Sequence, residues 1–195
     1  MKLINIDGPD GVGKTTLIEG LLRYFAILGK KVDFVHFPRY ETEIGSLIKE
    51  TLYLRTRMDP KSLQMLYSAD RINFSKFDYP KLVDLDYLFV DRYITSGVVY
   101  GQIDELDAND IMCFDKETIK ADLNIILTAP VNELMRRMSS RERDQYETEV
   151  IVTESIELFA DISKWFDNVV YVSGHQAKEL VLKETADLIT EVLGG

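Results

Sequence analysis

A glycine-rich segment near the start of the chain has the residue types and spacing of a phosphate-binding loop. The run GPDGVGKT, which begins at Gly8, fits the pattern G-x-x-x-x-G-K-[ST]. Glycines permit backbone angles that are closed to other residues, so their N–H groups can converge on phosphate oxygens at a helix N-terminus. Lys14 then supplies a charge for the β- and γ-phosphates, and the Thr15 hydroxyl supplies a ligand for Mg²⁺. The predicted nucleotide-binding residues are Gly8, Gly11, Val12, Gly13, Lys14, Thr15 and Thr16.

The segments on either side of this loop support its assignment. Residues 3–6 form a short apolar run typical of a buried strand, and residues 16–28 carry apolar side chains at helical spacing. A strand, a glycine-rich turn and a helix, in that order, are the context in which the motif binds phosphate.

Another candidate functional residue is an aspartate that follows a second apolar segment. Asp91 comes directly after residues 87–90, an arrangement that places a carboxylate close to Mg²⁺ in phosphate-loop proteins. Arg92 stands beside it. The alternative is that Asp91 caps a following helix while Arg92 pairs with a surface carboxylate, but the phosphate loop favours the functional interpretation.

Four arginines fall within eight residues between two expected helices. They are Arg136, Arg137, Arg141 and Arg143. A solvated helix end with local charge pairs is one explanation. Phosphoryl transfer, however, depends on positioning and charge stabilisation, and arginines that close over the γ-phosphate are a recurrent device. We therefore predict that residues 137–147 form an arginine-rich lid, in which Arg141 and Arg143 act in catalysis.

The composition is typical of a globular protein with more acidic than basic residues. Of 195 residues, 46% are hydrophobic and 29% are charged, which favours one domain over residues 1–195. The net charge of −10 argues against a nucleic acid as partner. No apolar run reaches the length of a membrane span, no secretory pattern is present, and the one cysteine cannot form an internal disulfide. We expect a cytoplasmic protein that does not bind membranes.

Strand-like and helix-like segments alternate along the chain. The short apolar runs are continuous rather than alternating in polarity, which is typical of a parallel sheet covered on both faces. The fold class predicted is therefore α/β, with a five-stranded parallel sheet and helices on both faces. The expected strands span residues 3–6, 31–37, 87–90, 123–127 and 168–172, and the expected helices span residues 16–28, 43–54, 60–77, 131–138, 150–165 and 177–193.

Several segments together resemble the thymidylate kinase family of nucleoside monophosphate kinases. The similarity runs in order over about residues 1–173. The segments that carry it are DGPDGVGKTT from Asp7, FPRY from Phe37, LYSADR from Leu66, DRYITSGVVY from Asp91 and RDQYE from Arg143. The resemblance implies an ATP-dependent kinase of the phosphate-loop monophosphate kinase fold that uses Mg²⁺, acts on dTMP and forms a homodimer.

The resemblance also implies roles at the pyrimidine. Arg71 would donate to the thymine carbonyl, where cytosine presents a donor instead. Tyr67, one helical turn earlier, would stack on the base. Phe37 would line the base pocket. Each has a structural alternative, an ion pair for Arg71 and a core position for the two aromatic residues. Further residues expected near the base are Ser96 and Gly97.

Other implied roles concern the acceptor phosphate, the sugar and ATP. Arg39 and Arg92 would hold the acceptor phosphate, since arginine favours bidentate phosphate contacts. Asp10 would accept from the 3′-hydroxyl, and Tyr100 would exclude a ribose 2′-hydroxyl. The remaining positions are Tyr146, which would close over the acceptor, and Arg136, which would pack on adenine.

Two departures from the family pattern bear on these roles. Gly11 occupies a position where some relatives carry an arginine, so a lid arginine, Arg141 or Arg143, would supply the catalytic cation. Gly97 replaces an asparagine that helps to read the base in many bacterial members, which leaves the pyrimidine preference open. A deoxynucleoside kinase, a deoxynucleotide kinase with a different base preference, and a regulatory nucleotide switch remain as alternatives. The set Phe37, Arg39, Tyr67 and Arg71 argues against a switch, which needs no second pocket.

Overall fold

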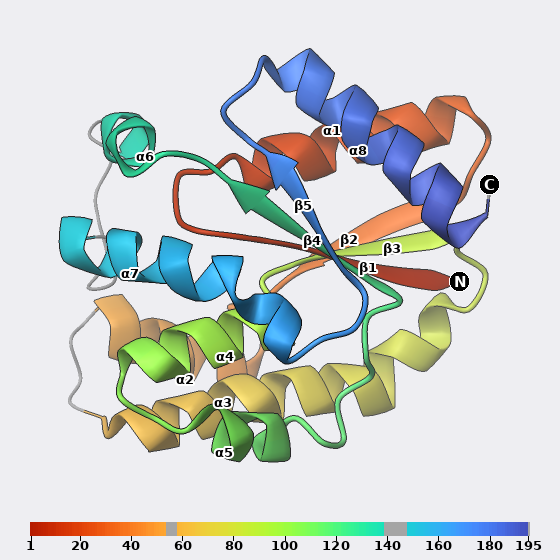
Figure 1. Cartoon of the computed structure of the whole chain (residues 1–195). Helices are drawn as coiled ribbons and strands as arrows, with labels where there is room; N and C mark the ends of the chain where they lie inside the picture. The colour runs from red at the N-terminus through yellow and green to blue at the C-terminus, as the bar shows by residue number, and fades with distance from the viewer. Residues whose placement is uncertain (54–57, 139–147, 195) are drawn as a thin grey trace.

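The computed structural model describes residues 1–53, 58–138 and 148–194. Its centre is a five-stranded sheet in the order β2-β3-β1-β4-β5, and every pair of neighbouring strands is parallel (Figure 1). The five predicted strands are confirmed. Their bounds are β1 Lys2–Asp7, β2 Val32–His36, β3 Tyr87–Asp91, β4 Leu123–Thr128 and β5 Val169–Ser173.

The central strands are buried on both faces, because the helices that connect parallel strands cover the sheet. Every residue of β3 is buried, as are five of the six residues in β1 and in β4. The two outer strands, β2 and β5, retain exposed positions. Continuous apolar runs in the middle and mixed runs at the edges are the pattern expected for a sheet between two helical layers.

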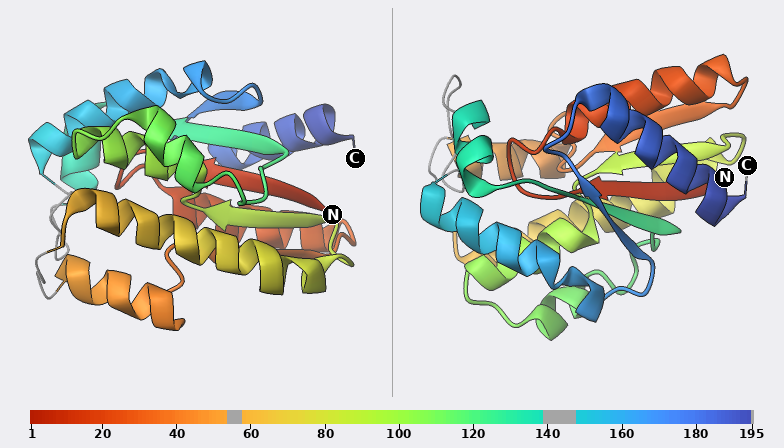
Figure 2. Two further views of the ribbon diagram at one scale, coloured as in Figure 1. Left: turned by 90° about the horizontal axis from the view of Figure 1, so that it is seen from below. Right: turned by 45° about the horizontal axis from the view of Figure 1, so that its top comes forward.

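Helices cover both faces of the sheet (Figures 1 and 2). Helices α1 and α8 pack together on one face, and α3, α4 and α7 lie on the other with α2 and α5 outside them. The predicted α/β class is confirmed. The bounds are α1 Lys14–Ile27, α2 Glu43–Tyr53, α3 Pro60–Asn73, α4 Ile94–Ile103, α5 Ala108–Phe114, α6 Val131–Met138, α7 Glu149–Ala160 and α8 Lys178–Leu193.

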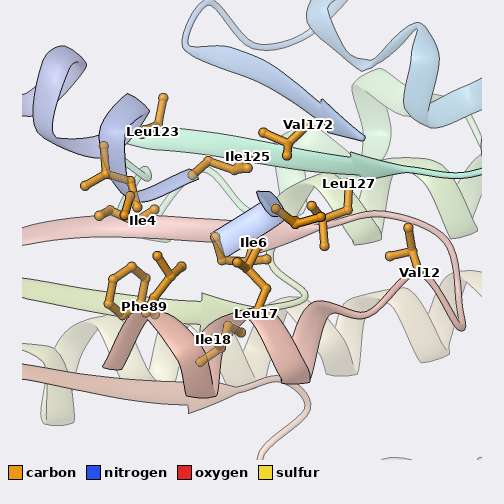
Figure 3. Packing of buried hydrophobic residues seen from close by; sticks show 14 of the residues in the cluster. Ile4, Ile6, Val12, Leu17, Ile18, Phe89, Leu123, Ile125, Leu127 and Val172 are labelled. Atoms are coloured by element: carbon orange, nitrogen blue, oxygen red, sulfur yellow. The ribbon is translucent and has the colours of Figure 1, made fainter. Parts of the chain in front are cut away.

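The largest hydrophobic cluster lies between the sheet and the layer formed by α1 and α8. Ile4 and Ile6 of β1 pack with Leu17 and Ile18 of α1. Phe89 of β3 belongs to the same cluster (Figure 3). Burying a side chain of this size contributes about 1.5–3 kcal/mol. This packing holds the start of α1, and with it the glycine-rich loop, at the end of β1.

Two helices were not expected from the sequence. Helix α4 is buried along residues 94–101, so it has no polar face and its apolar positions show no helical period. Helix α5 has only seven residues, and its start is fixed by the Asp107 carboxylate, which accepts from the Asn109 N–H. The long helix expected over residues 60–77 also divides, because α3 ends at Asn73 and a π-helical turn follows over Phe74–Asp78.

The carboxyl ends of the strands meet at one edge of the sheet. Asp7 ends β1, and in the strand register His36 of β2 lies opposite Asp91 of β3. Because β1 pairs with β3 on one side and β4 on the other, a crevice opens at its end, where ligands of such sheets bind. Among the described residues, no helix is both long and apolar enough to cross a membrane.

Candidate active site

A cleft of about 470 Å³ opens at this edge of the sheet. The glycine-rich loop forms one end, helices α3 and α4 form the other, and the ends of β2 and β3 lie between them. The predicted site residues that line it are Asp10, Gly11, Gly13, Lys14, Thr15, Thr16, Phe37, Tyr67, Arg71, Asp91, Arg92, Ser96, Gly97 and Tyr100.

The loop conformation explains its glycines. Gly8 has φ of +136°, and a Cβ there would lie 2.4 Å from the carbonyl oxygen of Leu127 in β4. Gly13 precedes α1 in a left-handed conformation with φ of +106°. L-residues with side chains rarely adopt these angles, so the loop can lie against β4 and direct its N–H groups only with glycine at these positions.

Lys14 is buried and directed back onto the loop. Its Nζ donates to the carbonyl oxygens of Gly8 at 2.8 Å and Pro9 at 3.1 Å, and lies 3.7 Å from Asp10 Oδ1. These contacts place a cation at the mouth of the loop, where the phosphates of a nucleotide gather.

Asp91 and Thr15 form the candidate magnesium site. His36 Nδ1 lies 3.2 Å from Asp91 Oδ2, whereas Asp91 Oδ1 is buried and has no hydrogen-bond partner among the described residues. Burial raises the pKa of Asp91, but His36, Lys14 and Arg92 outweigh it and leave that pKa below its usual value. The described residues hold no group of three metal-ligating side chains. Thr15 and Asp91 fit Mg²⁺, which in nucleotide sites takes few protein ligands and completes its shell with waters and phosphate oxygens.

Asp10, Arg92 and Tyr100 form a linked group in the middle of the cleft. Arg92, with φ of +61°, pairs with Asp10 Oδ1, and the Tyr100 hydroxyl donates to Asp10 Oδ2 at 3.0 Å. The Arg92 guanidinium also lies over the Tyr100 ring at 5.5 Å. Burial lowers the pKa of Arg92, and the Asp10 charge outweighs this, so the net shift is upward. Burial, reinforced by Asp10, raises the pKa of Tyr100, which keeps its hydroxyl neutral.

Tyr67 and Arg71 lie one helical turn apart on α3 and both face the cleft. Asp115, at the end of α5, holds the Arg71 guanidinium, with Nε 2.8 Å from Oδ1 and Nη2 2.6 Å from Oδ2. Nη2 also donates to Ser68 Oγ at 3.2 Å, whereas Nη1 has no partner among the described residues. Burial lowers the pKa of Arg71, but Asp115 raises it by more. Arg71 is thus a fixed cation with a donor left for a ligand.

The lack of a side chain at Gly97 leaves room for the Arg71 guanidinium. A Cβ on Gly97 of α4 would lie 3.0 Å from Arg71 Nη2, so a larger residue there would displace the guanidinium. Ser96, next to it, donates from Oγ to Asp7 Oδ1 at 2.8 Å. Asp7 Oδ1 also accepts from the Gly8 N–H at 2.9 Å. This carboxylate therefore joins the phosphate loop to the start of α4, a function that the sequence analysis did not anticipate.

Arg39 does not line the cleft in this structure. Its Nε donates to Asp70 at 2.9 Å, its Nη1 donates to Asp78 at 2.7 Å, and its guanidinium lies over the Phe74 ring at 5.3 Å. The next residue, Tyr40, lines the cleft instead, beside Phe37 and Pro38. Sequence reasoning missed Tyr40, although it stands in the same FPRY segment. Binding of the acceptor phosphate by Arg39 stays a prediction.

The ion pair of Arg39 with Asp70 supports a prediction about stability. Asp70 is fully buried, and its Oδ2 also accepts from the Arg39 N–H at 2.8 Å. Asp70→Ala should lower the free energy of unfolding by about 3–5 kcal/mol, because it removes the buried carboxylate that accepts from both the Nε and the backbone N–H of Arg39. Asp78→Ala removes a half-exposed partner of the same arginine and should cost much less. Urea denaturation of both variants checks this, and similar losses would contradict it.

Arg137, rather than Arg136, contacts the phosphate loop. Arg137 Nη1 donates to Val12 O at 3.1 Å, its Nη2 donates to Gly174 O at 3.1 Å, and its Nε pairs with Glu133. Arg136 is largely exposed, does not line the cleft, and also pairs with Glu133. Arginines 136 and 137 lower the pKa of Glu133 to about 2. The adenine contact of Arg136 stays a prediction. Arg141, Arg143, Tyr146 and all of the predicted lid beyond Met138 lie outside the described residues.

A phosphate loop, an acid at the end of the neighbouring strand and a second pocket with a fixed arginine together define a phosphate-loop kinase that acts on a nucleotide. Comparisons with known proteins identify the family within this class. The sequence model described as "Thymidylate kinase" matches residues 6–185. The chain belongs to the thymidylate kinase family, and is therefore an ATP-dependent phosphotransferase that converts dTMP to dTDP.

Individual relatives agree with the family. A probable thymidylate kinase of Methanocaldococcus jannaschii is 29% identical over 140 residues, which cover 71% of this chain and 70% of the relative. The thymidylate kinase of African swine fever virus is 30% identical over 83% of this chain and 68% of its own length. The solved structure of a Candida albicans thymidylate kinase has a TM-score of 0.79 and 22% identity, and the match covers 97% of this chain and 91% of that one, which shows the shared fold.

Proposed function

We propose that this chain holds Mg²⁺·ATP at the phosphate loop and dTMP between α3 and α4, and that the γ-phosphate passes between them. The observation that carries this arrangement is the continuity of the cleft. Lys14 and Arg71 line the same cleft, and Arg92 and Asp10 line it too. A switch that binds one nucleotide has no use for the second half of this cleft.

The reaction needs positioning and charge rather than a strong base. An oxygen of the acceptor phosphate is already an anion, so it attacks the γ-phosphorus in line. A new P–O bond forms, the bond from the γ-phosphorus to the bridging oxygen breaks, and ADP leaves with its electron pair. Lys14 neutralises charge on the transferring group, while Thr15 and Asp91 would hold the metal. Mg²⁺ supplies charge neutralisation on the β- and γ-oxygens when bound.

The middle of the cleft suits the acceptor's phosphate and sugar. Asp10 holds the Arg92 guanidinium in the cleft, where it would bind the acceptor phosphate. Tyr40 would be a further contact of that phosphate. Asp10 would accept from the 3′-hydroxyl. The Tyr100 ring, packed beneath Arg92, would leave no room for a 2′-hydroxyl. On the donor side, the contacts of Arg137 with Val12 and Gly174 make it a better candidate than Arg136 for the adenine pocket.

A second candidate is a deoxynucleotide kinase with another base preference. Gly97 favours it, because the asparagine that many relatives use to read the base is absent. Release of ADP should be measured with dTMP, dUMP, dCMP, dGMP and thymidine as acceptors. We expect dTMP to give the highest kcat/KM. A preference for thymidine would contradict a phosphate acceptor, and a preference for dCMP would contradict the role of Arg71.

The lid arginines give a prediction about catalysis. Arg141→Ala or Arg143→Ala should lower kcat far more than it weakens dTMP binding, if these side chains contact mainly the transition state. Steady-state kinetics together with dTMP titration separate the two effects. Should both variants keep their kcat and lose only dTMP affinity, the arginines clamp the acceptor instead.

The metal site gives another prediction. Chelation of Mg²⁺ should abolish turnover, and Thr15→Val should raise the Mg²⁺ concentration required for half-maximal rate, because it removes one ligand without changing the size of the side chain. Thr190→Val is the matched control, since Thr190 lies in α8 away from the cleft and its hydroxyl donates to the Ala186 carbonyl oxygen of its own helix. An identical Mg²⁺ requirement in wild type and Thr15→Val would contradict the assignment of Thr15.

We also infer that the protein is a cytoplasmic homodimer. Three large apolar side chains on α2 and α3 support an interface there, since Leu47, Tyr53 and Met65 are each at least 42% exposed. Sedimentation of wild type and of Met65→Lys tests the dimer, and a monomeric wild type at micromolar concentration would contradict it.

A further inference from the structure

Gln64 is a buried polar residue that no step of the reaction above requires. Its side chain is fully buried in α3, yet neither Oε1 nor Nε2 has a hydrogen-bond partner among the described residues. Nearly all buried polar groups in folded proteins are hydrogen-bonded, because an unsatisfied one loses its bonds to water without replacement. A carboxamide with both atoms unsatisfied therefore indicates a place where a ligand supplies the missing partner.

The helix geometry directs this carboxamide into the cleft. Gln64, Tyr67 and Arg71 have the spacing i, i+3 and i+7, which places them on one face of α3, and all three line the cleft. Helix α4 packs against this face and carries glycine opposite two of them. A Cβ on Gly101 would lie 3.6 Å from the Gln64 carboxamide carbon, just as a Cβ on Gly97 would approach Arg71.

The neighbours of Gln64 define which edge of the base it faces. A pyrimidine stacked on Tyr67 with its O4 at Arg71 has its N3 on one side of that carbonyl and its C5 on the other. Gly97 lies beside Arg71, Ser96 also lines the cleft, and the two suit the N3 edge. Gln64 lies two helical turns from Arg71 on α3, and its carboxamide faces Gly101 of α4 rather than Gly97. We assign this other side of the O4 carbonyl to the substituent on C5.

We propose that Gln64 is a specificity-determining residue for a hydrogen-bonding substituent on C5, and that the chain accepts a 5-hydroxymethyl deoxyuridine monophosphate at least as well as dTMP. This proposal rests on the proposed function, because it assumes the same cleft and the same transfer of the γ-phosphate. A hydroxymethyl group differs from the thymine methyl by one hydroxyl, which can either donate to Gln64 Oε1 or accept from Nε2. The thymine methyl satisfies neither atom.

The first test uses the wild-type enzyme. We would measure kcat/KM for 5-hydroxymethyl-dUMP and for dTMP with saturating Mg²⁺·ATP, and the dissociation constants of both by calorimetry. The expected result is a kcat/KM for 5-hydroxymethyl-dUMP equal to that for dTMP or higher. A wild-type enzyme that turns over dTMP well and disfavours 5-hydroxymethyl-dUMP tenfold or more would overturn this inference and leave the proposed function intact. An enzyme that phosphorylates neither would overturn both.

The second test assigns the effect to Gln64. Gln64→Met keeps the length of the side chain and removes its hydrogen-bonding atoms, and should lower the ratio of kcat/KM for 5-hydroxymethyl-dUMP over dTMP by about tenfold, the loss of one buried hydrogen bond. Gln102→Met is the matched control on α4, where the glutamine bonds only to the backbone of its own helix, and should leave the ratio unchanged. Gln64→Leu repeats the test if Gln64→Met does not fold. An unchanged ratio in a folded Gln64 variant would show that the carboxamide does not read the base and would overturn the proposal.

Discussion

Lys14→Ala is expected to lower kcat by roughly 10²–10³-fold or more while the protein remains folded. The Nζ atom is held at the mouth of the phosphate loop by two backbone carbonyls, so its charge is already in place when the γ-phosphate becomes more negative. A preorganised charge in a site shielded from water stabilises the transition state strongly. Single-turnover measurements with saturating ATP and dTMP would isolate this step from product release.

A matched control separates the charge from general effects of losing a lysine. Lys31→Ala removes an exposed lysine just before β2, at the opposite end of the sheet, and should leave kcat near the wild-type value. Thermal unfolding of both variants checks that the fold persists. A folded Lys14→Ala enzyme with nearly normal turnover would contradict the assignment of the phosphate loop.

Removing Arg71 is expected to harm dTMP far more than dCMP. A buried donor at O4 rejects cytosine, whose C4 amino group is also a donor, because both groups are then left without an acceptor. The penalty should reach several kcal/mol, about the cost of leaving two buried polar groups unsatisfied. Without the guanidinium this penalty disappears, so the preference for dTMP over dCMP should narrow by about two orders of magnitude.

The ion pair with Asp115 decides how this experiment is designed. Arg71→Ala alone leaves the buried Asp115 carboxylate without its partner and would destabilise the fold. The comparison should therefore be made between the wild type and the double variant Arg71→Ala with Asp115→Asn, in which neither buried charge is left without its partner. An equal dTMP/dCMP ratio of kcat/KM in these two enzymes would show that base specificity lies elsewhere, near Ser96 and Gly97.

The sheet and the phosphate loop could be predicted from the sequence because their signals are local. The central strands are largely apolar runs, and the residues of the loop motif lie next to one another in the sequence. Asp91 could be predicted for the same reason, because it directly follows a buried strand. The expectation that ligands gather at the carboxyl ends of parallel strands then placed these residues together.

Residues whose roles depend on distant partners could not be predicted in this way. Helix α4 is buried all round and shows no period, so its packing against α3 has no signal in the sequence. Asp115, which fixes Arg71, is 44 positions away from it. The choice between Arg39 and Tyr40 depends on which side of the chain faces the cleft, and so does the choice between Arg136 and Arg137. The partners that set it, Asp70 for Arg39 and the Val12 and Gly174 carbonyl oxygens for Arg137, are far away in the sequence.

The central claim is that the cleft transfers the γ-phosphate of ATP to an acceptor that already carries a phosphate. Phosphorus NMR of one mixture that contains enzyme, Mg²⁺, ATP and dTMP tests it most directly, because it identifies both products and their ratio. We predict that the signals of dTDP and ADP appear together in equal amounts. The appearance of ADP and inorganic phosphate without dTDP would contradict the account.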